Sequence, residues 1–395
     1  MKPSVLVLDG EQRAALAVVR SLGRHGVKVH VASHARRSLA GASRFAASES
    51  LVPDPIKGAE GYATAIARFS ADRDTLVILP VTEASTMALL EYRDLLGPVR
   101  IASSDLSRFG RATDKAAVLA LGSQLDIDVP AQWTIGGVED IDTVPTERYP
   151  LVVKPARSVV TGVAGRRKVG VQYARDAEEL AKIIRGLGPE AGPFLLQARI
   201  GGPGIGIFLL RWNGSILATF AHRRIREKPP SGGVSVCCES IAAPSELVRQ
   251  SVRLLEALDW EGVAMVEYKQ DRRTGRHYLM EINPRFWGSL QLAIDSGVDF
   301  PWYVYQAIEG ATITPNTHWE VGRRSRWSWG EVDHLLTRLR YTPETLDLPP
   351  DAPGLFSTAL QILTPWRPRQ KSDVFRWSDP LPAWRETVAW FRALT

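Results

Sequence analysis

The chain has 395 residues, of which 45% are hydrophobic and 23% charged, and its formal net charge is +6. This ordinary globular composition suggests about two or three domains. The basic residues are scattered rather than massed, so we expect no nucleic-acid partner. No run approaches the roughly 18 apolar residues that span a bilayer, so we expect no membrane-spanning segment.

The two cysteines and the N-terminus point to a cytoplasmic protein. Cys237 and Cys238 are neighbours on a predicted strand, where they face opposite sides, so neither a typical disulfide nor a paired metal site follows. Such cysteine usage fits a reducing compartment. The apolar run after Met1 is too short for a signal peptide and leads straight into a strand.

The first 110 residues alternate between predicted strands and helices. Short apolar runs predict buried strands at 4–8, 28–32, 75–79 and 99–102, and helical patterns lie at 12–24, 61–69 and 83–95. This alternation predicts a parallel sheet with helices on both faces. The first strand–helix turn lacks the Gly-x-Gly-x-x-Gly pattern, so we expect no NAD or FAD there.

A different pattern begins near residue 111. It predicts a helix at 115–125, a strand at 149–155, a glycine-bearing loop at 161–165, a strand at 169–173, a helix opening at Asp176 and a strand at 194–200. Lys154 lies at the end of an apolar strand. Its side chain could simply extend to the surface.

A segment of dense positive charge follows two further predicted strands, at 207–212 and 215–221. It contains His222, Arg223, Arg224 and Arg226, and it is costly to bury unless an anion meets it. The alternative is a solvated cationic loop. The nearby Ser231, Gly232 and Gly233 could present backbone N–H groups to a phosphate or carboxylate.

The most informative segment lies between residues 263 and 285. Two β-rich runs, 263–270 and 277–282, flank a turn containing Gly275, which predicts a β-hairpin. Glu281 and Asn283 then share a face, and Glu267 lies opposite Met280 or Glu281. Two carboxylates and an amide oxygen form a ligand set suited to Mg²⁺. In the alternative, the two carboxylates only line the wet face of a ribbon.

Glu267 together with the run Glu281-Ile-Asn283-Pro-Arg285 resembles the metal-binding signature of the ATP-grasp superfamily of carboxylate–amine (or thiol) ligases. Biotin carboxylase, carbamoyl-phosphate synthetase and D-aspartate ligase belong to that superfamily. The resemblance follows the order of elements from about residue 6 to about residue 310. It implies an α/β protein (α+β overall) with the ATP-grasp fold, which binds ATP with Mg²⁺ at Glu267, Glu281 and Asn283; Mn²⁺ could replace Mg²⁺.

The resemblance also suggests a division into domains. We expect a Rossmann-like pre-ATP-grasp domain at 1–110 and a catalytic region at 111–315, with a small subdomain at about 130–200 and a large one at about 200–315. Residues 316–395 would form a C-terminal extension rich in tryptophan and proline. The tryptophans at its far end could form a satellite core or a partner surface, and we favour packing: Trp366, Trp377, Trp384 and Trp390.

Further site residues follow from the resemblance. Lys115 and Lys154 match lysines that contact nucleotide phosphates, and the loop at 162–165 resembles one that closes over them. Arg285 would stabilise the oxyanion of the reacting group. The hinge that presents backbone groups to adenine aligns with Gln197, Ala198, Arg199 and Ile200, although Ala198 replaces a residue that is often acidic in relatives. The ATP and acyl-phosphate sites would be bordered by His222, Arg224, Ser231, Gly232 and Gly233.

The function implied is a ligase that joins a carboxylate to an amine through an acyl phosphate, with release of ADP and phosphate. One alternative is a carboxylase acting through carboxyphosphate, and another is a non-catalytic ATP-binding sensor. Amino acids or small peptides are the expected substrates by association with relatives alone, and the sequence names neither them nor the pathway. The oligomeric state stays open, although homodimers are common among relatives.

Overall fold

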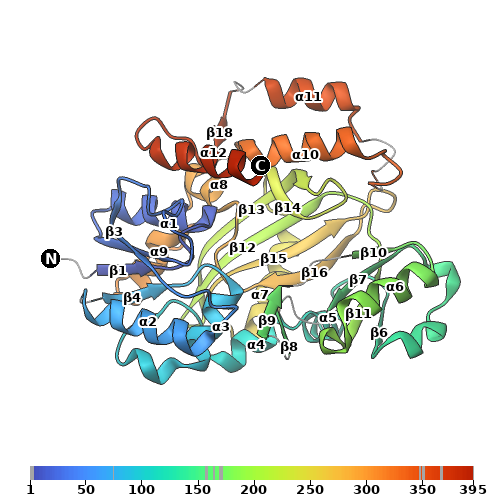
Figure 1. Ribbon diagram of the computed structural model, residues 1–395, viewed down its shortest axis with the longest axis horizontal. Helices are drawn as coiled ribbons and strands as arrows, with labels where there is room; N and C mark the ends of the chain where they lie inside the picture. Colours follow the sequence, from blue (N-terminus) through green and yellow to red (C-terminus); the bar gives the residue numbers. More distant parts are fainter. Residues whose placement is uncertain are drawn as a thin grey trace.

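The computed structural model describes residues 4–73, 75–155, 159–162, 165–168, 172–346, 348, 352–364 and 368–394. Figure 1 shows a parallel sheet at the N-terminal end, a large central sheet, a small sheet on the opposite side and a layer of C-terminal helices above. Among the described residues, no helix has the length and apolar character needed to cross a membrane.

The N-terminal sheet has five parallel strands in the order β3-β2-β1-β4-β5. The strands are β1 (Ser4–Val7), β2 (Val29–Ser33), β3 (Ala46–Leu51), β4 (Thr75–Leu79) and β5 (Arg100–Ile101). Helix α1 (Arg13–Arg24) packs on one face, while α2 (Ala59–Ala71) and α3 (Glu83–Glu91) cover the other. The expected parallel sheet is therefore confirmed.

Strand β3 was not among the predicted strands. Its sequence, Ala-Ala-Ser-Glu-Ser-Leu, alternates half-buried with exposed positions and carries only one strongly apolar side chain. It lies at the edge of the sheet, where pairing with β2 rather than burial holds it in place. A search for apolar runs cannot find such a strand, because the backbone contacts that define it come from elsewhere in the chain.

The small sheet is antiparallel, in the order β10-β7-β11-β6. Its strands are β6 (Gln132–Ile135), β7 (Leu151–Pro155), β10 (Gln172–Ala174) and β11 (Phe194–Ala198), and helix α6 (Ala177–Leu187) packs on it. The Asp176 side chain caps α6 by accepting from the backbone N–H of Glu179. A two-stranded hairpin, β8 (Val159–Gly162) and β9 (Gly165–Lys168), carries the glycine loop; residues 163–164, and 169–171 of the predicted strand at 169–173, lie outside the described residues.

The central sheet has seven strands in the order β16-β15-β12-β13-β14-β17-β18. They are β12 (Gly204–Trp212), β13 (Ser215–Lys228), β14 (Val234–Ser240), β15 (Gly262–Gln270), β16 (His277–Asn283), β17 (Arg324–Arg326) and β18 (Gln370–Ser372). One face shares a core with α1, α8 (Leu290–Asp295) and α9 (Phe300–Ile308). The other packs against α4 (Leu106–Thr113), α5 (Lys115–Gln124) and α7 (Ser245–Ala257).

The charged segment after residue 221 is part of a strand and not a solvated loop. Strand β13 continues to Lys228, which pairs with Val234 of β14. His222 is 1% exposed, and Arg224 and Arg226 are only partly exposed. Arg224 forms an ion pair with Glu267 of β15, and Arg226 forms one with Glu331 of the helix at 328–340. Because these charges are paired, the strand can continue through both arginines.

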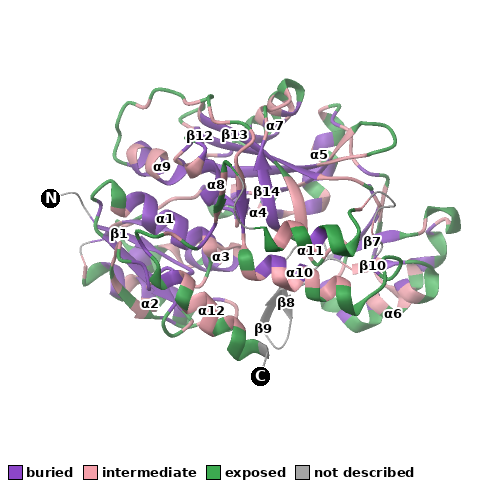
Figure 2. Cartoon of the chain, turned by 90° about the horizontal axis from the view of Figure 1, so that it is seen from above, coloured by how far each residue is buried: buried purple, intermediate pink, exposed green. Residues whose placement is uncertain are grey.

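Beyond residue 315, the described parts of the chain add two strands and three helices. Strand β17 pairs with β14 and β18 pairs with β17, while α10 (Ser328–Arg340), α11 (Leu355–Leu363) and α12 (Leu381–Leu394) form the outer layer (Figures 1 and 2). Trp390 stacks on Trp329 with ring centroids 4.2 Å apart, as the packing interpretation predicts. The same interpretation is wrong for Trp377 and Trp384, which are 81% and 65% exposed; Trp366 lies outside the described residues.

Candidate functional site

Two carboxylates oppose each other on the β15–β16 hairpin. Glu267 pairs with Glu281, so the register is the Glu281 alternative rather than the Met280 one, and a β-bulge follows at Tyr268. Asn283 lies two residues beyond Glu281, and its Nδ2 donates to Glu281 Oε1 over 2.9 Å. The structure therefore brings the three expected metal ligands to one face of the sheet.

Three cations surround these carboxylates. Arg224 Nη2 donates to Glu267 Oε2, and Lys115 Nζ lies 3.6 Å from Glu281 Oε2. Burial raises the pKa of Glu267, and the nearby Glu281 charge raises it further, although Arg224 acts against both. Burial would also raise the pKa of Glu281, but Lys115 and Lys154 outweigh it and hold that pKa below its usual range. Glu281 is therefore the carboxylate held in its ionised form by the site.

Lys154 reaches the site from the small sheet. It ends β7 in a buried position, and its Nζ donates to Gln197 Oε1 on the neighbouring strand β11 over 2.7 Å. Gln197 is fully buried, and its other amide atom, Nε2, has no hydrogen-bond partner. An unpaired buried amide nitrogen is costly, so this atom is a donor suited to a bound ligand.

Two glycines on β12 let side chains of β13 approach β15. Gly206 lies between His222 and Glu267 in the sheet, being paired with both. A Cβ on Gly206 would come within 2.9 Å of His222 Cδ2, and a Cβ on Gly204 within 3.0 Å of Arg224 Cδ. The absence of side chains at these two positions therefore leaves the space through which Arg224 reaches across β12 to Glu267.

His222 is a buried, uncharged side chain on the same face as the two carboxylates. Burial lowers the pKa of His222 to about 3, and the Arg224 charge adds to the effect, so the ring is neutral at physiological pH. It packs on Phe208 with ring centroids 4.7 Å apart, and its Nδ1 has no hydrogen-bond partner. His222 and Gln197 thus each offer the site an unsatisfied polar atom.

The remaining expected residues lie around this centre. Arg285 Nη2 donates to Asn283 Oδ1 over 3.1 Å, so Arg285 adjoins the metal-ligand candidates. Strand β11 ends at Ala198, and the hinge residues Arg199 and Ile200 follow it. In the Ser231–Gly233 turn, Ser231 O accepts from Tyr173 and Gly233 O accepts from Arg224, while the Gly232 N–H donates to Pro229 O over 3.1 Å.

Helix α10 contacts the charged C-terminal half of β13. The sequence did not suggest this contact. Glu331 is fully buried and accepts from both Arg226 and Arg326. His334 Nδ1 lies 2.6 Å from the backbone carbonyl of Glu227, whose side chain in turn accepts from Arg224 over 2.8 Å. The position of Arg224 thus depends on residues more than 100 positions further along the chain.

Sequence reasoning also missed Glu227 and the two glycines of β12. The alternation Gly202-Pro-Gly204-Ile-Gly206 leads into a strand and not a helix, so it is not a dinucleotide fingerprint. A signal was nonetheless present, since glycine inside a strand often marks the close approach of a neighbouring group. Glu227 gave no comparable signal, because only its contact with Arg224 distinguishes it from other charged residues.

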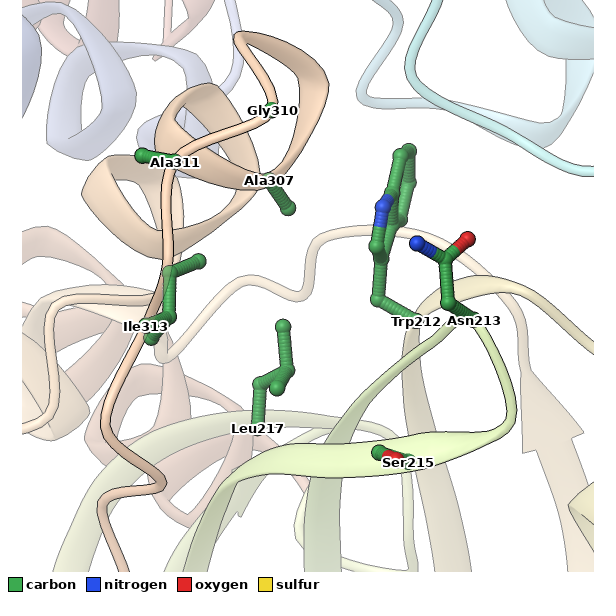
Figure 3. A pocket seen from close by; sticks show the side chains of 8 residues that line it. All are labelled: Trp212, Asn213, Ser215, Leu217, Ala307, Gly310, Ala311 and Ile313. Carbon is green, nitrogen blue, oxygen red and sulfur yellow. The ribbon is translucent and has the colours of Figure 1, made fainter.

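One cavity lies away from the site residues, and a second one reaches the expected site residue Ser231. One, of about 250 Å³, lies between the β12–β13 turn and the end of α9; Trp212, Leu217 and Ile313 are among its lining residues (Figure 3). None of its lining residues is titratable, so it offers no acid–base chemistry. The other, of about 630 Å³, lies beside the small sheet and is lined in part by Tyr173, Arg175 and Ser231.

Comparison with known structures identifies the class of fold. An L-amino acid ligase from Bacillus licheniformis superposes with a TM-score of 0.61 at 18% identity, over 78% of this chain and 75% of that one. The biotin carboxylase domain of 2-oxoglutarate carboxylase from Hydrogenobacter thermophilus, in complex with MgADP, ADP and bicarbonate, gives 0.63 at 15% identity, over 82% and 74%. The protein has the ATP-grasp fold, and the resemblance noted in its sequence is confirmed.

Two sequence comparisons agree with this fold. Residues 190–329 match the model of a family described as "ATP-grasp in the biosynthetic pathway with Ter operon". The N-terminal section of the carbamoyl phosphate synthase large chain from Methanopyrus kandleri is 26% identical over 221 residues, which cover 53% of this chain. The chain spans only 37% of that relative's length, so the relative's activity does not transfer to it as a whole.

The site residues fit a nucleotide with a divalent cation. Within the described ranges, no cluster of three or more His, Cys, Asp or Glu side chains could hold a metal ion by itself. Glu267, Glu281 and Asn283 are therefore an incomplete shell of oxygen ligands, which suits an ion that also binds phosphate oxygens. The two lysines and the unpaired Gln197 Nε2 are likewise suited to an anionic, hydrogen-bonding ligand.

Proposed function

We propose that the protein is an ATP- and Mg²⁺-dependent ligase that joins a carboxylate to an amine. The observation that carries the proposal is the opposed pair of the buried Glu267 and the partly buried Glu281, which lie beside Asn283 and are surrounded by Lys115, Lys154 and Arg224. Two carboxylates facing each other repel, and their convergence with cations is expected where a highly charged ligand is bound. The ATP-grasp fold supports ATP as that ligand.

The proposed reaction has two steps. A carboxylate oxygen of the substrate bonds to the γ-phosphorus of ATP as the bond to the β–γ bridging oxygen breaks, so that ADP leaves. The amine nitrogen then attacks the acyl carbon, phosphate departs with the bonding electrons, and the nitrogen loses a proton to form the amide. Neither step requires a nucleophile from the protein.

Mg²⁺ held by Glu267, Glu281 and Asn283 would offset charge on the phosphates. Lys154 and Lys115 would hold the phosphate oxygens, and Arg285, next to Asn283, would stabilise the oxyanion of the acyl group. Arg224 now neutralises Glu267, and its fork of donors would turn to the substrate anions once Glu267 has another cationic partner. The hinge at Gln197–Ile200 would present its backbone to adenine.

The substrates are proposed by class only. An amino acid or a small peptide as carboxylate, with a second as amine, agrees with the named reaction of the L-amino acid ligase that shares the fold. The named activity of the biotin carboxylase domain supports the alternative, in which bicarbonate takes the place of the organic carboxylate. The matched family model is described as belonging to a biosynthetic pathway, which agrees with either reaction.

The direct test is a mass-spectrometric assay of nucleotide products with Mg-ATP and a pool of amino acids, small peptides and other carboxylates. We expect ADP and phosphate only when the pool is present, together with a product whose mass equals two pool members less one water. Release of AMP and pyrophosphate would contradict the acyl-phosphate route. ADP release that needs only bicarbonate would favour the carboxylase, and intact bound ATP would favour a sensor.

The charge on Lys154 predicts how activity depends on pH. Burial lowers the pKa of Lys154 to about 8, with Glu281 opposing the fall and Lys115 adding to it. Because the pKa is depressed, the ammonium is present below pH 8 and is lost as the pH rises through that value. We expect kcat/KM for ATP, which reports the free enzyme, to fall about tenfold per pH unit above pH 8.

The matched control is Lys154→Arg, whose guanidinium stays protonated throughout this range. Its kcat/KM is expected to be lower at pH 7, because arginine is larger, but to show no descending limb below about pH 9.5. The same limb in both proteins would assign the titration to another group. A flat wild-type profile would contradict a role for the Lys154 charge.

A further inference from the structure

Helix α11 is inverted relative to an ordinary surface helix, because its polar side chains Thr358 and Gln361 face the protein while its large apolar side chains do not. Thr358 is buried and accepts from Arg338 Nη1 over 2.7 Å, while Gln361 Oε1 accepts from Arg226 Nη1 over 3.0 Å. Arg326 Nη2 donates to the carbonyl of Ile362 over 2.7 Å. Three arginines thus hold α11 by its polar face.

The apolar face of α11 points outward. Phe356, Leu360 and Leu363 are 82%, 58% and 75% exposed. They follow a spacing of four and then three residues, which places them in one stripe along the helix. An outward apolar stripe is the reverse of the usual pattern and indicates a surface that another body covers.

The neighbouring helix α10 also carries exposed apolar side chains. Leu336 and Leu339 of α10 are 43% and 61% exposed, and α11 packs against α10 (Figure 1). In the part of the chain that the structure describes, most of the exposed large hydrophobic side chains lie between Leu336 and Phe391. Figure 2 shows α10 and α11 side by side, with exposed segments along both. We call Leu336, Leu339, Leu355, Phe356, Leu360 and Leu363 the outer apolar patch.

The chemistry of the outer apolar patch limits the kinds of partner that could bind to it. The patch contains no charged side chain, which disfavours a nucleic acid. The arginines beneath it are directed inward: Arg226 and Arg326 to Glu331, and Arg338 to Thr358. An anionic membrane surface is usually bound by several basic side chains flanking an apolar face, and the three arginines beneath α11 are engaged within the protein. A predominantly apolar protein surface fits best.

The size of the outer apolar patch matches half of a dimer interface. With about 100–200 Å² for each fully exposed side chain, its six residues offer on the order of 500 Å² of apolar area. A standard interface buries about 800 Å² per partner, of which roughly 60% is apolar. The patch therefore supplies, from one copy, the apolar area that such an interface requires.

We propose that two copies of this chain associate through the outer apolar patch, with α11 of each copy packed antiparallel against the other about a two-fold axis. Leu360 lies at the middle of the stripe, so the axis passes beside it and brings Leu360 against Leu360 of the partner subunit. Phe356 then faces Leu363 of the partner subunit, and the interface is self-complementary, as two-fold symmetry requires. This association is independent of the reaction that the site performs.

The first experiment is sedimentation velocity on the full chain from about 1 to 50 μM, a range that spans the expected affinity of an interface of this size. The molar mass obtained for the wild type is expected to be twice the monomer mass of 43.6 kDa. Leu360→Glu should convert it to monomer by placing two charges together at the axis. Leu95→Glu is the matched control, since Leu95 is 47% exposed and far from the patch, and it should remain a dimer.

A cross-linking experiment tests the geometry separately. Leu360→Cys should form an intermolecular disulfide under mild oxidation, whereas Leu95→Cys should not, and both native cysteines are buried. A monomeric wild type would overturn the proposal, including one that binds lipid vesicles through the patch. So would a dimer that persists in Leu360→Glu, or one that Leu360→Cys fails to cross-link, because the copies would then meet elsewhere.

Discussion

Replacing Glu281 with glutamine should lower ATP turnover by about 10²–10³-fold or more while leaving the fold intact. The amide keeps the size of the side chain and its ability to accept from Asn283, but it removes the negative charge that Lys115 and Lys154 stabilise. A divalent cation then loses one of two anionic ligands. The measurement is the rate of ADP formation with the substrate pool, together with Mn²⁺ affinity by electron paramagnetic resonance.

Glu246→Gln is the matched control for this substitution. Glu246 lies in the first turn of α7 on the surface, where it pairs with Arg249 and Gln250 of its own helix. Its amide variant should match wild type in both ADP formation and Mn²⁺ affinity. If Glu281→Gln retained both properties as well, the metal ligands would have to be sought elsewhere in the protein.

Replacing Asp379 with alanine should destabilise the folded protein by about 3–5 kcal/mol. Asp379 accepts from Arg20 Nε over 2.8 Å, from Ser43 Oγ over 2.7 Å and from the backbone N–H of Arg44 over 2.9 Å, and the side chains of Asp379 and Arg20 are 1% exposed. Burial lowers the pKa of Arg20, and Asp379 offsets that effect. Without the carboxylate, the buried Arg20 guanidinium loses its anionic partner and keeps only its contacts with the backbone carbonyls of Asp373 and Asp379. The Ser43 hydroxyl and the Arg44 N–H lose their acceptor.

Chemical denaturation followed by circular dichroism measures this effect. Glu246→Ala is the control, because Glu246 pairs on the surface with Arg249 and Gln250 of its own helix and its loss should leave the unfolding midpoint essentially unchanged. The double variant Arg20→Met with Asp379→Leu should recover much of the lost stability, since apolar residues of similar volume can replace a buried pair. An Asp379→Ala midpoint equal to that of wild type would show that the contact contributes little.

The Arg20–Asp379 contact also shows what could not be predicted from the sequence. It joins the first helix to a segment 359 positions further along the chain. That segment has no recognisable sequence motif. Parallel strands β1, β2 and β4 were predicted because short apolar runs alternate with amphipathic helices, a local signal. Strand β3 and the full length of β13 were not, because their burial depends on partners distant in sequence.

In the candidate site, too, some features could be predicted from local sequence and others could not. The β15–β16 hairpin and its three oxygen ligands followed from a two-residue period and a glycine turn, both local properties. Arg224 was recognised as a candidate, but its contact with Glu267 depends on the bare backbone of Gly204 and Gly206 one strand away. Whether a charged segment is strand or solvated loop depends on which carboxylates the fold places beside it.

The sequence by itself determined the parallel N-terminal sheet, the carboxylate-bearing hairpin and the resemblance to ATP-grasp proteins, because periodicity, turns and short motifs are encoded within a few neighbouring residues. Only the tertiary structure decided that α10 holds β13 through Glu331 and His334, and that α11 turns its apolar face outward. Both depend on contacts between segments far apart in the chain, since the helix period of α11 is the same whichever face is buried. Periodicity reveals that a helix has an apolar face, and only tertiary packing decides whether that face is buried or exposed.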